Sequence, residues 1–160
     1  MNDFLKKRLL SLNIERHLST NLTVANYRPF ILSNNLVFIS GQLSLTDSGI
    51  KYQGKIKRKF VLDKIKDAVE IATSNLLWNL NDSIIDHKKK INKIKCCNIK
   101  GYFNCEDIFY DHSSLLNFSS DLIVKVLGKR AGEHSRSALG VSSLPMNSPV
   151  EIEGIFSISS

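Results

Sequence analysis

The chain has 160 residues and a mass of 18.0 kDa, which is enough for one domain with a substantial buried core. Hydrophobic residues make up 42% and charged residues 23% of the sequence, as is typical of a soluble globular protein. The net charge of +7 suggests an anionic partner such as RNA, but the two basic clusters, Lys55–Lys59 and Lys88–Lys95, lack the interleaved aromatic residues that stack bases, which argues against nucleic-acid binding.

The first element expected is a short amphipathic helix within residues 1–12, where leucines are mixed with charged residues. This segment lacks the continuous apolar core of a signal peptide, and no later segment resembles a membrane span. We therefore expect a cytoplasmic protein with no membrane partner.

Two β-favouring apolar runs follow a polar stretch over residues 19–26. Phe30–Ser33 and Leu36–Ser40 flank an Asn-Asn pair and therefore predict a β-hairpin. We expect Gly41 and Gln42 to end the second strand, and residues 46–49 to form a further turn.

Apolar residues recur at steps of three and four over Phe60–Leu80 and predict the clearest helix of the chain. A polar, lysine-rich loop is expected over Asn79–Lys90, and a strand over Ile91–Phe103. A second helix is expected over Ser113–Leu127, because Gly128 is a suitable C-terminal stop.

Three cysteines fall in or near the strand expected over residues 91–103: Cys96, Cys97 and Cys105. Adjacent cysteines point to opposite faces of a strand, and the spacing matches neither a disulfide framework nor a zinc site. We expect free thiols and no bound metal.

Two further strands near the C-terminus complete the element order ββαβαββ. This order predicts an α+β domain in which one sheet carries both helices on the same face. No linker, repeat or low-complexity block divides the sequence, so we expect a single domain over residues 1–160, with residues 1–20 as an N-terminal helical extension.

The most informative stretch is the pair of strand-like segments His134–Val141 and Val150–Phe156, which contain Arg136 and Glu151. Charged side chains seldom lie in such apolar segments without a partner or a function. An arginine binds a carboxylate through two parallel hydrogen bonds, and a nearby glutamate can hold or activate a water molecule. The two residues therefore predict a site for a small carboxylate-bearing molecule.

The residues alone leave a second interpretation open. Arg136 shares its strand face with the small residue Ala138, which leaves room for a ligand, but a structural ion pair with Glu151 or Glu153 explains the same pattern. His134 precedes the arginine, and a lone histidine at the start of a strand is more often structural than catalytic.

Several motifs together resemble the RidA/YjgF family of reactive-intermediate deaminases, in particular its longer, YjgF/chorismate-mutase-like branch. The resemblance covers residues 1–158. It rests on the following segments: Val24–Pro29, Leu36–Leu43, Asn117 with Ser120–Leu122, His134–Val141, Leu144-Pro145 and Pro149–Glu153.

The resemblance implies a chorismate-mutase-like fold, a homotrimer, and ligand clefts between subunits. The implied reaction is hydrolysis of a 2-imino or 2-enamino acid to its 2-keto acid and ammonia, without a metal or organic cofactor.

The resemblance also implies roles for single residues. Arg136 matches the arginine that binds the substrate carboxylate, and Glu151 matches the glutamate that orients the attacking water. Tyr27, Asn117 and Ala138 match positions that line the cleft, although Ala138 stands where many active members have a cysteine.

Two further departures from the family pattern concern the same region. Phe118 replaces a small residue after Asn117, and the loop Gly128–Glu133 is one residue longer than usual, so both are expected to affect the cleft. Gly41 and Gln42 match the family's Ser-Gly-Gln signature, for which we expect close backbone packing.

Three functions follow from these observations. The first is a deaminase that acts on a small imino acid. The second is a non-catalytic trimer that binds a small carboxylate metabolite. The third, which the charge and an older family label suggest, is RNA binding or endoribonuclease activity.

Overall fold

A five-stranded sheet forms the centre of the computed structural model, which describes residues 3–19, 26–85, 87 and 90–160. The strands lie in the order β1-β2-β7-β5-β6. Their bounds are β1 (Phe30–Ser33), β2 (Leu36–Leu43), β5 (Lys93–Asn104), β6 (Ser135–Val141) and β7 (Val150–Ser159). A small hairpin, β3 (Leu45–Thr46) with β4 (Gly49–Ile50), lies outside this sheet.

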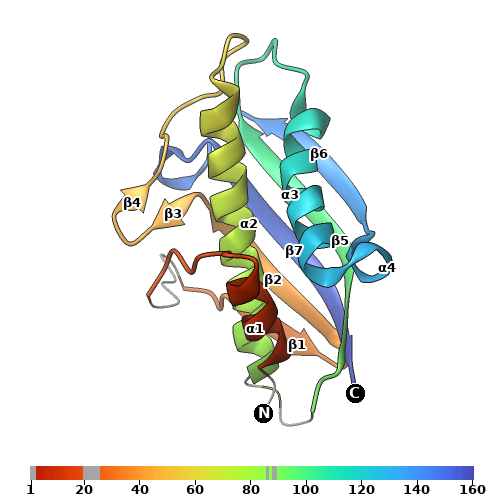
Figure 1. The fold of residues 1–160 in the computed structure, drawn as a ribbon. Helices are drawn as coiled ribbons and strands as arrows, with labels where there is room; N and C mark the ends of the chain where they lie inside the picture. Colours follow the sequence, from red (N-terminus) through yellow and green to blue (C-terminus); the bar gives the residue numbers. More distant parts are fainter. Residues whose placement is uncertain (1–2, 20–25, 86, 88–89) are drawn as a thin grey trace.

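The last strand occupies the middle of the sheet. β7 pairs antiparallel with both β2 and β5, whereas β6 pairs in parallel with the outer side of β5. The chain passes from β5 to β6 through a helical crossover, as parallel pairing requires. β6 and β7 are consecutive in sequence but are separated in the sheet by β5 (Figure 1).

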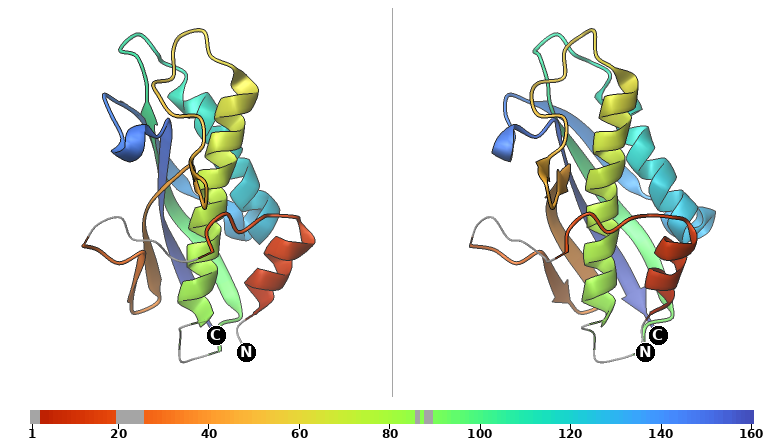
Figure 2. Two further views of the ribbon diagram at one scale, coloured as in Figure 1. Left: turned by 90° about the vertical axis from the view of Figure 1, so that its left-hand side faces the viewer. Right: turned by 60° about the vertical axis from the view of Figure 1, so that its left-hand side comes forward.

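Both long helices, α2 (Leu62–Ile85) and α3 (His112–Leu127), cover the same face of the sheet, so the molecule has two main layers (Figure 2). This arrangement confirms the predicted α+β class. The shorter helices are α1 (Phe4–Ser11), α4 (Lys129–Gly132) and a 3₁₀ turn over Pro145–Asn147. None of the helices within the described residues is long and apolar enough to cross a membrane.

One hydrophobic cluster fills the space between the sheet and the helices. Residues of β7 alternate between buried and half-buried, because only one face of this strand meets the helices. Phe103 of β5 and Phe156 of β7 are fully buried and pack in this cluster with Leu76 and Leu77 of α2.

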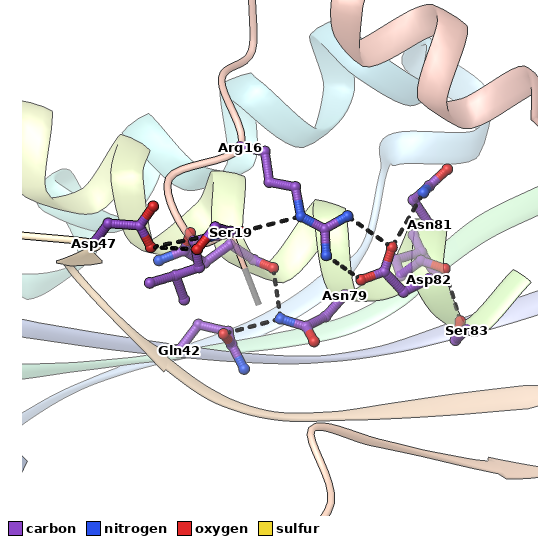
Figure 3. A network of polar contacts seen from close by, with 11 residues as sticks. Arg16, Ser19, Gln42, Asp47, Asn79, Asn81, Asp82 and Ser83 are labelled. Atoms are coloured by element: carbon purple, nitrogen blue, oxygen red, sulfur yellow. Dashed lines mark hydrogen bonds and ion pairs between the residues drawn. The ribbon is translucent and has the colours of Figure 1, made fainter. Parts of the chain in front are cut away.

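The helix α2 continues five residues beyond the predicted end at Leu80, so the loop expected over residues 79–90 is wrong for its first part. The polar residues there have partners outside the helix. Asn79 donates to Gln42 of β2 at 3.1 Å, and Asp82 pairs with Arg16 at 2.6 Å (Figure 3). These contacts come from strands and from the N-terminal segment, which local periodicity does not reveal.

The helix α1 packs onto the helical layer through Leu5 and Leu9, which are both buried. Arg8 on the same helix donates to two carbonyl oxygens at the C-terminal end of α3, Val126 O at 3.3 Å and Lys125 O at 3.1 Å. Carbonyls in the last turn of a helix have no partner within the helix, and a cation there also interacts favourably with the helix dipole.

We expect Arg8→Ala to lower the free energy of unfolding by about 1–2 kcal/mol, because it removes charge-assisted bonds to these carbonyls. Urea denaturation monitored by circular dichroism measures the change. Lys6→Ala is the matched control, since Lys6 is an exposed cation on the same short helix. Equal stabilities of the two variants would contradict the capping role.

Candidate functional site

Arg136 lies on β6, the edge strand, and its side chain points toward α3. The guanidinium donates from Nη1 to Ser120 Oγ at 2.9 Å, and from Nη2 to Ser113 Oγ at 3.2 Å and Ser113 O at 3.3 Å. An arginine carries five N–H donors, so these contacts orient the guanidinium and leave further donors for a ligand. Arg136 is half-buried, which makes such donors effective.

The helix α3 presents Ser113, Asn117 and Ser120 on one face, because they are spaced by four and three residues. Asn117 is exposed, and its spacing places it between Ser113 and Ser120, the two residues that Arg136 contacts. Phe118 points elsewhere: it packs against the hydrophobic core, and Lys66 Nζ of α2 lies 5.8 Å from its ring centroid. Within one chain, Phe118 therefore does not point toward Arg136.

Ala138 follows Arg136 on the same face of β6 and packs partly against the core. The next residue of this row is Gly140, and a Cβ there would lie 2.4 Å from His112 Nε2 and 2.9 Å from Cys105 Sγ. The row on β6 thus consists of one arginine followed by two small residues, as the alternation of a strand predicts.

Glu151 lies on the other face of the sheet, which the helices do not cover. Its neighbours along β7, Val150 and Ile152, are fully buried under the helices, so Glu151 projects from the opposite face. The strand β5 separates β7 from the strand that carries Arg136. Arg136 and Glu151 therefore do not lie on neighbouring strands, because β7 pairs with β5 and not with β6.

The structure also removes the ion-pair interpretation. Arg136 contacts serines of α3, and Glu153 accepts a hydrogen bond from Lys100 at 2.7 Å on the open face of the sheet. Within one chain, neither Glu151 nor Glu153 shares a sheet face with Arg136.

Gly41 provides the space that Glu151 occupies. A Cβ at position 41 would lie 1.7 Å from Glu151 Oε1, so the Glu151 side chain would have to move if any other residue replaced this glycine. The pairing of β2 with β7 shifts register between Ile39 and Gln42, which is typical of a β-bulge. The prediction that Gly41 and Gln42 end the strand is wrong, because β2 continues through this bulge to Leu43.

Burial raises the pKa of Glu151 above its usual value, and the negative charge of Glu153 adds to the effect. A half-buried carboxylate with a raised pKa, next to bare glycine backbone, is protonated more readily than an exposed carboxylate and can accept hydrogen bonds from a water molecule.

Tyr27 is 45% exposed and precedes β1, at the sheet edge opposite to β6. A single chain therefore does not bring Tyr27 next to Arg136. The motif Val24–Pro29 that contains it begins outside the described residues.

His134 belongs to the surroundings of Arg136. Its Nε2 lies 3.0 Å from Ser120 Oγ, and its Nδ1 contacts Gly132 O. Sequence reasoning missed Ser113 and Ser120 as partners of the arginine. Their seven-residue spacing around Asn117 was the available signal, because seven residues make two turns of a helix.

The residues that the structure describes include no group of three or more His, Cys, Asp or Glu side chains that could hold a metal ion. Among those residues, the polar groups near Arg136 are hydroxyls, a backbone carbonyl and one imidazole, a set better suited to an organic carboxylate than to a metal.

A comparison with known protein families assigns the chain to one of them. The family described as "YjgF/chorismate mutase-like, putative endoribonuclease" matches residues 7–156. The chain belongs to the YjgF/chorismate mutase-like family.

Members of the YjgF/chorismate mutase-like family and similar proteins show how far the likeness extends. The protein Atu1372 of Agrobacterium tumefaciens, whose function is unknown, is 31% identical, with a TM-score of 0.79 over 99% of this chain and 96% of its own. TCP17 of Trypanosoma cruzi is 26% identical over 81% of this chain and 79% of its own length. TdcF of Escherichia coli, solved with bound serine, is 16% identical, with a TM-score of 0.54 over 86% and 91% of the two chains, and this likeness shows the fold alone.

We expect Glu151→Gln to stabilise the protein at neutral pH. Burial raises the pKa of the Glu151 carboxyl above its ordinary value of 4.5, so the charged form of this group opposes folding above that pH. The increase in stability of Glu151→Gln over the wild type should disappear as the pH falls below about 4.5. At that pH, the Glu151 carboxyl of the wild type is protonated in both the folded and the unfolded state. Thermal unfolding from pH 4 to 8 measures this dependence.

Glu153→Gln is the control for this measurement, because Glu153 is paired with Lys100 and its removal should give no gain. A stabilisation by Glu151→Gln that is the same at every pH would contradict the burial of a charged carboxylate.

Proposed function

We propose that the chain binds a small carboxylate-bearing metabolite at Arg136 and hydrolyses a 2-imino or 2-enamino acid to the 2-keto acid and ammonia. The observation that carries this proposal is the half-buried guanidinium of Arg136, which two serines of α3 hold in place while donors remain available. A fixed guanidinium loses little side-chain entropy when it binds a carboxylate.

The chemistry follows from the position of the carboxylate. A 2-enamino acid first becomes the imine, as a proton moves through solvent from its nitrogen to C3. Water then adds to the C=N carbon next to the carboxylate while the C=N π electrons move to nitrogen. The two protons of the added water pass to that nitrogen, and the C–N bond breaks as the carbonyl forms and ammonia leaves. Arg136 anchors the carboxylate and stabilises charge that develops beside it. Asn117, on the same helix face, is placed to line the cleft, and Ala138 leaves room for the reacting group.

A homotrimer would complete this site. Glu151 and Arg136 lie on opposite faces of one sheet, so a glutamate that orients water for a ligand on Arg136 must come from a neighbouring subunit. The edge strand β6 of one copy and the open sheet face of the next would then form the cleft, with Tyr27 of the second copy as part of its wall.

The open sheet face has the apolar residues that such an assembly needs. Ile31, Phe38 and Ile155 are paired across β1, β2 and β7 and form one row on this face. Ile31 is 51% and Phe38 40% exposed, and Leu36 and Leu139 on the same face are also exposed. Exposed apolar residues in a continuous row are typical of a surface that a partner covers. The serine bound by TdcF, which has the same fold, agrees with an amino-acid-sized ligand.

We expect Phe38→Glu to convert the trimer into monomers, because a charge in this row opposes burial against a second copy. Analytical ultracentrifugation measures the mass. Tyr110→Glu is the control, since Tyr110 is 80% exposed and lies in the loop before α3. A monomeric wild type, or a trimeric Phe38→Glu protein, would contradict assembly through this face.

We expect the wild type to accelerate keto-acid release when it is coupled to an enzyme that generates 2-aminoacrylate. Arg136→Ala should lower kcat/KM by about 100-fold or more, as expected for loss of a charge-assisted carboxylate contact. Arg58→Ala, which removes an exposed arginine from the loop before α2, is the matched control.

Equal acceleration by the wild type and Arg136→Ala would contradict the proposed catalysis. Binding of 2-oxobutanoate that depends on Arg136, without turnover of any imino acid, would favour a non-catalytic trimer that binds a carboxylate metabolite.

A further inference from the structure

A chain of hydrogen bonds runs from Arg136 through Ser120 to His134 and ends at a backbone carbonyl. Arg136 Nη1 lies 2.9 Å from Ser120 Oγ, which lies 3.0 Å from His134 Nε2, and His134 Nδ1 contacts Gly132 O. We propose that His134 is a positioning residue that acts through Ser120 to orient Arg136 for a carboxylate ligand. The proposal rests on the proposed function, because it concerns the same arginine.

The available donors and acceptors determine which group donates in each of these hydrogen bonds. Gly132 O can only accept, so the proton of neutral His134 is on Nδ1 and Nε2 is an acceptor. Ser120 must then donate its O–H to Nε2, which leaves the oxygen lone pairs for the N–H of Arg136. Each group therefore donates in the same direction, from the arginine toward the backbone, and polarisation along such a chain strengthens each bond.

Without His134, the Ser120 hydroxyl has an alternative. A helical serine can donate to the backbone carbonyl of the preceding turn, which rotates its lone pairs away from a neighbouring strand. The imidazole therefore selects the one rotamer of Ser120 that serves Arg136. The second contact of the guanidinium, with Ser113, is longer at 3.2–3.3 Å, so Ser120 is the closer of the two anchors.

The loop before β6 positions Gly132, whose carbonyl ends this series of hydrogen bonds. It forms the short helix α4, Lys129–Gly132, after Gly128, whose φ is 85°. A Cβ at Gly132 would lie 2.6 Å from the backbone Cα of Val124, so this residue packs directly against α3. The helix α4 thus holds the Gly132 carbonyl against the helix that carries Ser120.

The proton positions can be measured without a ligand. Nitrogen-15 chemical shifts and long-range couplings of the ring of His134 at pH 8 should show the proton on Nδ1 and an acceptor at Nε2. The Arg136 side-chain resonances should be broader or less dispersed in Ser120→Ala than in the wild type. A His134 ring protonated on Nε2, or Arg136 resonances unchanged by Ser120→Ala, would overturn the proposal.

Ligand binding provides the second measurement, with pyruvate as the probe in calorimetry. Ser120→Ala and His134→Ala should each weaken pyruvate binding by roughly tenfold, because Arg136 is then less well oriented. This change corresponds to a loss of about 1.4 kcal/mol in binding free energy. His134→Gln should restore most of the affinity, because its side-chain oxygen can accept the Ser120 hydroxyl proton. In the deaminase assay, the losses should appear in KM more than in kcat, since the carboxylate is bound in the ground and transition states alike.

Ser114→Ala is the matched control, because it removes an exposed hydroxyl from the first turn of the same helix. If Ser120→Ala and His134→Ala both bind pyruvate as tightly as the wild type does, the positioning role is overturned. The proposed carboxylate site at Arg136 is not affected by that result. If the wild type binds no pyruvate and releases no keto acid, the proposed function fails instead, and the resonances of His134 and Arg136 still decide whether the chain of hydrogen bonds orients the arginine.

Discussion

The central position of β7 is the constraint on which the rest of the structure depends. Because the last strand inserts between β2 and β5, it fixes which side chains face the helices and which face outward. Glu151 therefore lies over Gly41 on the open face, whereas Arg136 on β6 faces α3. A single chain thus presents an anchored cation at its edge and a half-buried carboxylate on its open face.

Arg136 and Glu151 both lie on strands of the sheet, and the position of each side chain depends on a local feature. The cation depends on hydroxyls at two turns of α3, and the carboxylate depends on a bulge and a glycine in β2. Side chains held in this way are pre-organised, so little free energy would be lost in ordering them if a ligand bound there. The exposed apolar row on the open face gives a physical reason for a second copy to approach the same surface.

The bounds of the two long helices depend partly on local sequence and partly on distant contacts. The apolar face of α3 and the stop at Gly128 were readable from the sequence, and its observed bounds differ from the prediction by one residue. The end of α2 was not readable, because its last turns are polar. Those turns are stable as a helix since Gln42 and the N-terminal segment supply their hydrogen-bond partners.

The amino-acid sequence by itself determined the α+β class, the hairpin of β1 and β2 and the two long helices, and it drew attention to Arg136 and Glu151 as candidate site residues. These features depend on local periodicity, turn residues and charged side chains in apolar segments, all of which are properties of neighbouring residues. Only the tertiary structure decided that the two charged residues lie on opposite faces and that Ser113, Ser120 and His134 surround the arginine. The physical reason is that strand order and the approach of a helix to a strand arise from long-range packing, which residue spacing along the chain does not encode.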